Sequence, residues 1–351
     1  MHSYIIAFIG TLIFIRLLIP FAHKAGLVDV PVGRKQHMGS IPLVGGMAMF
    51  LGFLLSVLTL SEIPVDYNSF LFAAVVLIVV GVVDDRDEVG VRLRFSAQLL
   101  TALIMTSTAG HVIGSMGDIL GTGNVLLGDW AIPFTVFAVL GVTNALNMAD
   151  GIDGLAGSVS LISFLSMFYL AADAGSPDAK LLLIFISVLV PFLVFNLPYS
   201  GKRTAKVFMG DAGSMFLGYS LAWFFIDLSQ GENAIMTPIT TLWCFAIPLF
   251  DTVSIMLRRL LKGHSPFRPD RDHFHHIFLA AGFSNRRTLI IIVMTQVIMS
   301  SIGIIGYKLG VPESLMFFSY LALFALFFWA LKRAWYVMRA LRQMNENVEQ
   351  S

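Results

Sequence analysis

Residues 70–88 read FLFAAVVLIVVGVVDDRDE, an apolar run that ends in a cluster of charged side chains. The same pattern of an apolar run followed by a polar loop recurs along the 351-residue chain, which is 57% hydrophobic and only 13% charged. With a mean hydropathy of +0.81, the chain is too apolar for a soluble domain of this size. The sequence therefore predicts an integral membrane protein.

Eleven apolar runs, each bounded by charges or turn residues, predict eleven membrane-spanning helices. A bilayer core about 30 Å thick needs roughly 20 apolar residues per helix. We therefore expect an all-α, polytopic fold. We expect one membrane domain over residues 1–337, with its functional site on cytoplasmic loops, and a polar cytoplasmic tail over 338–351. The predicted spans are residues 3–21, 41–60, 69–83, 95–113, 130–148, 156–174, 180–198, 213–229, 236–256, 288–307 and 314–331.

Lys and Arg are distributed unevenly between the two sets of loops. One set, with the carboxyl-terminal segment, holds 20 of the 23 basic residues, while the opposite loops keep only Lys180 and Lys308, and Arg16 lies within the first span. Because cytoplasmic loops are enriched in Lys and Arg, we place the amino terminus in the periplasm and the carboxyl terminus in the cytoplasm. The external stretch 118–128 contains Gly-Thr-Gly-Asn between apolar residues and predicts a hairpin.

Adjacent carboxylates directly after an apolar run form the first candidate site. Asp84 and Asp85 abut the run, where they repel each other and lose hydration, so a hard cation or a cationic substrate is a fitting counter-charge. Asp87 and Glu88 lie further along and fit a solvated helix end. We assign function to the first pair only.

The segment 143–157 joins two apolar runs with almost no charge apart from two aspartates. Asn147, Asp150 and Asp153 stand three residues apart, which places three oxygen-bearing side chains on roughly one face if the segment is helical. A packing role explains the glycines that follow these residues, but it does not explain two carboxylates at the membrane edge. We favour a functional role for this segment.

A lone carboxylate, Asp211, stands between Gly210 and Gly213 at the start of another apolar run. Asp is common as a helix N-cap. A carboxylate in this position also suits Mg²⁺, which prefers few carboxylates combined with phosphate oxygens. The sequence leaves both interpretations open.

The basic loop 258–287 concentrates arginines and histidines. Zinc fits poorly, because the single cysteine, Cys244, lies elsewhere and the arginines oppose a cation. Anion binding fits better, since arginines donate paired hydrogen bonds to a diphosphate and His273 can add another. Lys35, in an earlier basic stretch, is a candidate for binding a lipid phosphate, although simple attraction to anionic lipids explains it equally well.

Taken together, these strings resemble the polyprenyl-phosphate N-acetylhexosamine 1-phosphate transferase superfamily, which includes the MraY-type and WecA-type bacterial enzymes. The likeness extends over nearly the whole chain, and the loop around His273 looks like the WecA type, because Phe274 interrupts the run of adjacent histidines usual in the MraY type. The motifs are Lys35-Gln36-His37, Asp84-Asp85, Asn147-Met148-Ala149-Asp150-Gly151-Ile152-Asp153-Gly154, Phe208-Met209-Gly210-Asp211 and Pro269-Asp270-Arg271-Asp272-His273-Phe274-His275-His276.

The resemblance implies transfer of GlcNAc 1-phosphate from UDP-GlcNAc to undecaprenyl phosphate, with release of UMP and a requirement for Mg²⁺ or Mn²⁺. The reaction would begin a lipid-linked glycan, such as O antigen or enterobacterial common antigen, at the bacterial inner membrane. By this resemblance Asp153 and Asp211 hold the metal, and Asp84 and Asp85 lie beside it near the acceptor phosphate. The residues expected to contact the nucleotide, diphosphate or sugar are Asp150, Asn147, Arg259, His273, Arg271, His275 and His276.

Several alternatives stay open at this stage. The lipid phosphate attacks the donor directly, or an aspartate first forms a covalent intermediate. The substrate is UDP-GlcNAc or, as alternatives, another UDP-N-acetylhexosamine or a muramoyl-pentapeptide donor. An ion-coupled transporter is the alternative from a different class, although its charges should lie nearer mid-membrane. We expect membrane lipid and no nucleic acid as a partner, and the sequence leaves the oligomeric state open, a homodimer included.

Overall fold

The computed structural model describes residues 2–30, 39–60, 66–197, 205–232, 234–263, 265 and 273–349. Within these ranges the chain is a bundle of long helices with one small antiparallel β ribbon, in which β1 (Val28–Asp29) pairs with β2 (Ile41–Pro42). The expected all-α membrane architecture is confirmed at this level. The helices are α1 (Ser3–Ala25), α2 (Gly45–Val57), α3 (Asp66–Asp87), α4 (Val91–Thr108), η1 (Gly128–Trp130), α5 (Ala131–Ala149), α6 (Leu155–Asp173), α7 (Ala179–Asn196), α8 (Gly210–Asp227), α9 (Pro238–Cys244), α10 (Ala246–Leu261), α11 (Phe274–Ala280), α12 (Asn285–Lys308) and α13 (Glu313–Glu349).

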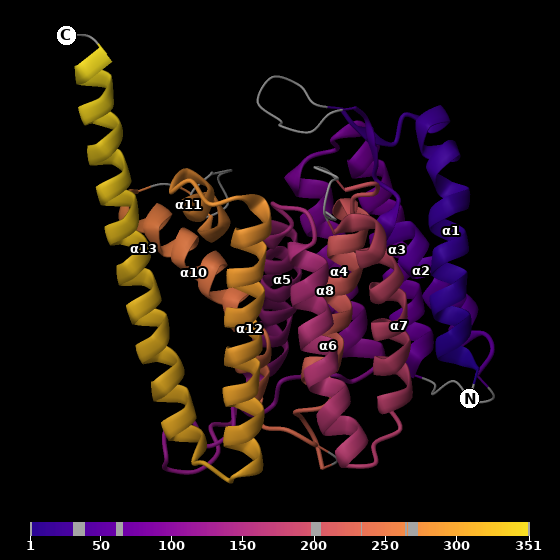
Figure 1. The fold of residues 1–351 in the computed structure, drawn as a ribbon. Coiled ribbons are helices and arrows are strands. Elements are labelled where there is room, and N and C mark those ends of the chain that lie inside the picture. The colour runs from indigo at the N-terminus through magenta and orange to yellow at the C-terminus, as the bar shows by residue number, and fades with distance from the viewer. Residues whose placement is uncertain are drawn as a thin grey trace.

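Every predicted apolar run contains a helix, but not every helix meets the length and hydropathy of a membrane span. Among the described residues seven helices do so, or eight if α9 and α10 count as one bent span. The count of eleven spans therefore stays a prediction. Figure 1 shows that α1 begins at one end of the bundle, whereas α13 runs past the opposite end, where α10 and α11 lie. Which end faces the cytoplasm also stays a prediction.

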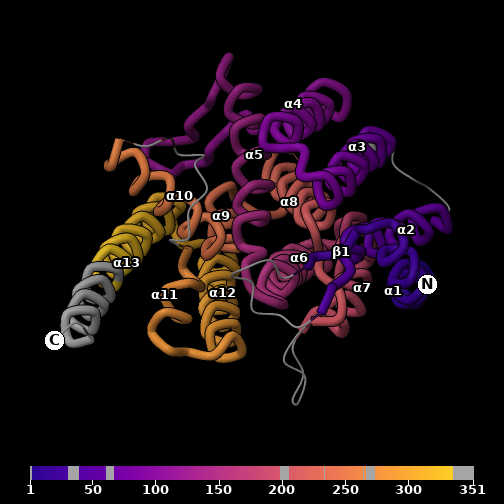
Figure 2. Tube along the Cα trace, turned by 90° about the horizontal axis from the view of Figure 1, so that it is seen from above, coloured from indigo at the N-terminus to yellow at the C-terminus, as the bar shows by residue number. Residues whose placement is uncertain are grey.

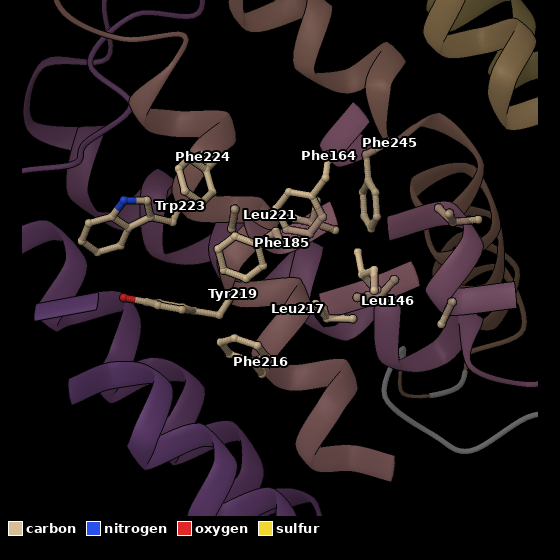
Figure 3. Close-up of a cluster of buried hydrophobic side chains, with 14 of the residues drawn as sticks. Leu146, Phe164, Phe185, Phe216, Leu217, Tyr219, Leu221, Trp223, Phe224 and Phe245 are labelled. Carbon is tan, nitrogen blue, oxygen red and sulfur yellow. The ribbon is translucent and has the colours of Figure 1, made fainter. Parts of the chain in front are cut away.

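Helix α8 lies at the centre of the bundle, packed against α2, α3, α5 and α6 (Figure 2). It is apolar all round and almost wholly buried, as expected for a helix without a solvent face. Large aromatic side chains fix it in place. Tyr219 stacks on Phe70 of α3 with ring centroids 5.7 Å apart. Phe224 packs edge-on against Phe164 of α6 (Figure 3). The start of α8 is thus attached to the most deeply buried part of the molecule.

The predicted span 236–256 is wrong as a continuous helix, because it breaks at Phe245 into α9 and α10, which meet at 86°. A break inside an apolar bundle exposes backbone groups that need new partners. Gln296 of α12 supplies them, since its Oε1 accepts from Ile247 N at 2.9 Å and its Nε2 donates to Cys244 O at 3.0 Å. The bend sends α10 across the end of the bundle.

The stretch between α4 and α5 forms the predicted hairpin, at the end of the bundle opposite to α11. Met116 N donates to Val125 O, and Val125 N donates to Gly117 O. Gln230 fastens the hairpin from the far end of α8, because it accepts from Gly114 N at 3.1 Å and donates to Ser115 O at 3.0 Å. The hairpin begins a few residues earlier than predicted.

Helix α13 runs without a break past the predicted end of its span at residue 331.

Candidate active site

Asp211, in the first turn of α8, is the centre of a polar cluster at one end of the bundle. Asn147, in the last turn of α5, donates to Asp211 Oδ1 at 2.5 Å and to Ser214 Oγ at 2.8 Å. Arg94, in the first turn of α4, donates from Nη1 to Asp211 Oδ2 at 2.8 Å and lies 3.2 Å from Asp84 Oδ2. One arginine therefore bridges a carboxylate of α3 and a carboxylate of α8.

Asp85 is turned toward the backbone at the start of α8. Its Oδ1 accepts from Asp211 N at 2.7 Å, and its Oδ2 accepts from Ala212 N at 3.2 Å. The first amides of a helix have no partner within the helix and carry partial positive charge, so a carboxylate there is stabilising. Gly210, with φ +73°, leaves the space that the Asp85 carboxylate fills. Asp85 is thus an N-cap supplied from another helix.

Three glycines allow α2, α3 and α8 to approach each other next to Asp211. A Cβ added at Gly46 would meet the backbone of Gly213 and Ala212, and one added at Gly81 would meet the backbone of Ala212. Backbone hydrogen bonds join the same region, because Gly46 N donates to Met209 O at 3.0 Å. This close approach brings Asp84 and Asp85 of α3 to the start of α8.

Helix α5 ends at Ala149, so the predicted single helical face for Asn147, Asp150 and Asp153 is wrong. Residues 150–154 form a turn in which Gly154, with φ +83°, reverses the chain into α6. Burial raises the pKa of Asp150 to about 7, and the negative charges of Asp211 and Asp153 act in the same direction. Asp150 therefore belongs to the carboxylate cluster although it is not on the helix.

Asp153 lies on the far side of this turn. Its Oδ2 accepts from Ala205 N at 3.0 Å, in the segment that leads into α8. Asn196 of α7 fixes the same region, since it accepts from Gly154 N at 2.8 Å and donates to Val207 O at 2.9 Å. The turn is therefore tied to the approach to Asp211, and a shared metal ion between Asp153 and Asp211 stays a prediction.

A cavity of about 620 Å³ starts beside this cluster and follows α5 toward the hairpin between α4 and α5. The volume is typical of a ligand pocket. Its lining is mostly apolar, and the two arginines of the lining lie at the cluster end. The lining at that end includes Arg94, Asn147, Arg259 and His273. Along α5 it includes Phe134, Phe137, Gly141 and Met148, and near the hairpin it includes Ile113, Met116, Gln230 and Phe317.

His273 and His275 lie in different surroundings. His273 lines the large cavity, and its Nδ1 lies 3.0 Å from Asp251 Oδ2 of α10. His275 is buried, and its ring fills the space beside Gly151 in the 150–154 turn. Burial lowers the pKa of His275 to about 3, assisted by His276 and His273. This environment favours a neutral packing role for His275.

Of the four remaining predicted site residues, two lie within the described residues and two lie outside them. Arg259 is buried, with 6% of its surface exposed, and lines the cavity. His276 is half-buried with its ring centroid 4.2 Å from that of His275. Lys35 and Arg271, both predicted to bind substrate, lie outside the described residues.

The carboxylates of the cluster suit a hard divalent cation in their chemistry. Mg²⁺ and Mn²⁺ take oxygen ligands, and Mg²⁺ is usually bound by one or two carboxylates together with phosphate oxygens. In the part of the chain that the structure describes, no three His, Cys, Asp or Glu side chains form a ready-made cage. The residues present therefore fit an ion that is completed by a phosphorylated ligand, with Asp211 as the central carboxylate.

Sequence reasoning missed two residues of this site, and each carried a signal. Arg94 stands just before the predicted span 95–113 and was counted only as a topological charge, whereas α4 begins at Val91 and includes it. Asp251 is a lone carboxylate inside the predicted span 236–256. An ionisable residue inside a membrane segment is a functional candidate by default, and this rule could have identified Asp251.

Comparison with known proteins adds the family. A model described as "Glycosyl transferase family 4" matches residues 67–229. Relatives from several bacteria carry the name undecaprenyl-phosphate alpha-N-acetylglucosaminyl 1-phosphate transferase. The protein from Salmonella typhi is 40% identical over 97% of this chain and 93% of its own length. The proteins from Yersinia pestis and Escherichia coli (strain K12) are 38% and 37% identical, each over 98% of this chain and 94% of its own length. With such likeness over nearly its whole length, in addition to the carboxylate cluster, the chain belongs to glycosyl transferase family 4.

Proposed function

We propose that this protein transfers GlcNAc 1-phosphate from UDP-GlcNAc to undecaprenyl phosphate, giving undecaprenyl-diphospho-GlcNAc and UMP. The observation that carries the proposal is the junction between a carboxylate cluster and one end of a long apolar cavity. The cluster suits phosphorylated groups and a divalent cation, and the apolar cavity suits a polyprenyl chain. The names of the relatives supply the two substrates.

In the proposed reaction, an oxygen of the lipid phosphate attacks the phosphorus that carries GlcNAc. The new phosphorus–oxygen bond forms as the bond to UMP breaks, and UMP leaves with the electron pair. The acceptor phosphate has a second pKa of about 6, so it is mostly a dianion at neutral pH and needs no strong base. Catalysis then rests on alignment and charge neutralisation.

The contacts of Asp84 and Asp85 indicate different roles for these two adjacent aspartates. Both oxygens of Asp85 accept backbone amides of α8, which leaves Asp84 as the better candidate to position the acceptor phosphate or take its remaining proton. Arg94 beside Asp84 and Arg259 in the cavity wall supply positive charge for the phosphates. Asn147 and Asp150 lie close enough to the cluster to orient the nucleotide.

We infer that Asp211, together with Asp153, would hold Mg²⁺ or Mn²⁺. When bound, the ion would neutralise charge on the diphosphate of the donor. Asn147 holds the Asp211 carboxylate by one hydrogen bond, which fixes its direction before the substrate arrives. We place the site on the cytoplasmic side of the bacterial inner membrane, because the Lys and Arg distribution assigns these loops to the cytoplasm.

The test uses the purified chain in nanodiscs with radiolabelled UDP-GlcNAc and undecaprenyl phosphate, with Mg²⁺ or with EDTA. We expect labelled lipid and free UMP only with the cation. A panel that contains other UDP-N-acetylhexosamines and UDP-N-acetylmuramoyl-pentapeptide addresses donor choice. If another donor is used and UDP-GlcNAc is not, the proposed substrate is wrong.

Two matched aspartates in α3 sharpen this test. Asp84 is buried in the cluster, whereas Asp87, one turn later, is exposed and forms an ion pair with Arg86. Asp84→Ala should abolish labelled lipid, and Asp87→Ala should leave it unchanged. Incubation with UDP-GlcNAc alone tests the two-step route, because exchange of labelled UMP into the donor without lipid would favour a covalent aspartyl intermediate over direct attack.

A further inference from the structure

Asp251 lies behind His273 as seen from the large cavity. It is buried on α10, with 7% of its surface exposed, and lines a small neighbouring cavity beside His275. Its Oδ2 lies 3.0 Å from His273 Nδ1, and its Oδ1 accepts from Phe274 N at 2.8 Å. Both oxygens of the carboxylate are therefore directed at the start of α11.

The contact fixes which nitrogen of His273 is free. An ionised carboxylate only accepts hydrogen bonds, so the proton on Nδ1 points to Asp251 and Nε2 is left for the cavity. His273 is itself 9% exposed and lines that cavity together with Arg259 and Thr252. The carboxylate also supplies the counter-charge that an imidazolium needs when it meets an anion.

We propose that Asp251 is a positioning residue that holds His273 with Nε2 directed at the diphosphate of the sugar-nucleotide donor. This inference rests on the proposed function and adds to it a residue that touches neither substrate. A second carboxylate oxygen bound to Phe274 N fixes the backbone at His273 as well as its ring. The start of α11 and the imidazole are thus oriented by one side chain.

Asp251→Asn separates the positioning role from a structural one. The amide oxygen still accepts from Phe274 N, so α11 keeps its anchor, but the amide nitrogen now faces His273 Nδ1 as a donor. The imidazole loses its counter-charge and changes tautomer. Asp251→Ala removes both contacts. Ser254→Ala is the matched control, because Ser254 is buried on the same helix and its hydroxyl has no hydrogen-bond partner among the described residues.

We expect Asp251→Asn to unfold at the wild-type temperature and to lose about 10- to 100-fold in kcat/KM for UDP-GlcNAc, the same scale as the loss of an outer hydrogen-bond partner of a metal-binding histidine. The KM for undecaprenyl phosphate should not change. In a His273→Ala background, Asp251→Asn should cause no further loss. Ser254→Ala should keep wild-type kinetics.

Two results would overturn the positioning role. The first is full activity of Asp251→Asn together with loss of stability in Asp251→Ala, which would make Asp251 an anchor of α11 only. The second is an equal additional loss when Asp251→Asn is combined with His273→Ala, which would mean that Asp251 acts independently of His273. If the wild-type chain makes no lipid product from UDP-GlcNAc, the proposed function fails instead, so the two failures are distinguishable.

Discussion

Replacement of Gly46 by Ala should reduce turnover far more than its cost in stability suggests. A Cβ at Gly46 would lie 2.9 Å from the carbonyl carbon of Ala212 and nearer still to N and Cα of Gly213. Carbon atoms in contact lie about 3.5–4.0 Å apart, so α2 and α8 must separate by at least about 0.6 Å at Ala212 and by more at Gly213. The obstacle is backbone, which cannot rotate away.

The displaced segment carries Asp211. Overpacking of this kind costs about 1–3 kcal/mol of stability, while a shift on the order of 1 Å at reacting groups can reduce the rate about 100-fold. Hydrogen bonds from Gly45 N and Gly46 N to residues 208 and 209 hold the two elements together, so the strain should reach the start of α8. Gly213→Ala, whose Cβ would lie 2.8 Å from Gly46 Cα, should have the same effect from the other side.

Gly52→Ala is the control on the same helix. Its Cβ would meet the Thr11 hydroxyl first and the Thr11 backbone N at 3.0 Å, and it lies about 9 Å along α2 from Gly46 at 1.5 Å per residue. Thermal unfolding and the radiolabelled lipid assay are measured on the three variants in nanodiscs. Gly52→Ala should lose stability but keep wild-type kcat. If Gly46→Ala keeps wild-type kcat while losing stability, the placement of Asp211 does not depend on this glycine contact.

Four further predictions concern the cluster itself. Arg94→Ala leaves the Asp84 and Asp211 carboxylates without the arginine that they share, so it should lower the free energy of unfolding in EDTA by about 1–3 kcal/mol. Mg²⁺ should raise the unfolding temperature of this variant more than that of wild type. Equal shifts in the two proteins would contradict this prediction. Asp85→Ala removes the cap of α8 and should cost about 2 kcal/mol in denaturant titrations; an unchanged midpoint would show that the cap is not needed. Because the pKa of Asp150 rises from 3.8 to about 7 on folding, the folded state holds a proton that the unfolded state has lost, and stability should fall as pH rises between these values. Asp150→Asn should remove this part of the decline when melting is followed in EDTA, and parallel curves for the two proteins would argue against it. Chelation by EDTA should abolish lipid product, with activity restored by Mg²⁺ or Mn²⁺ and no restoration by monovalent salt.

The sequence allowed prediction of the membrane class and of the residues in the carboxylate cluster, because both depend on local patterns. Asp84 and Asp85 were recognisable from their place directly after an apolar run. Their different contacts were not, since these depend on how closely the glycines of α2 and α3 approach α8. Pairing across distant segments is a property of packing and is absent from local sequence.

Predictions failed where the backbone departs from regular helix. The spacing of Asn147, Asp150 and Asp153 suggested one helical face, but the chain turns after Ala149 and uses Gly154 in a left-handed conformation. The apolar run 236–256 looked continuous, yet it bends at Phe245, where Gln296 supplies hydrogen-bond partners for the broken segment. Hydropathy reports the apolar character of a run, and it does not report such distant partners.

The course of the cavity along α5 has a consequence for how the two reactants meet. A sugar nucleotide is dissolved in water, and the chain of a polyprenyl phosphate is buried in the bilayer. For the two to react in the absence of a protein site, one of them would have to enter the other's solvent. Here the apolar walls line about 20 Å of α5 and end at a group of charges. Each reactant can therefore remain in its own phase, and only the two phosphate-bearing ends need to touch.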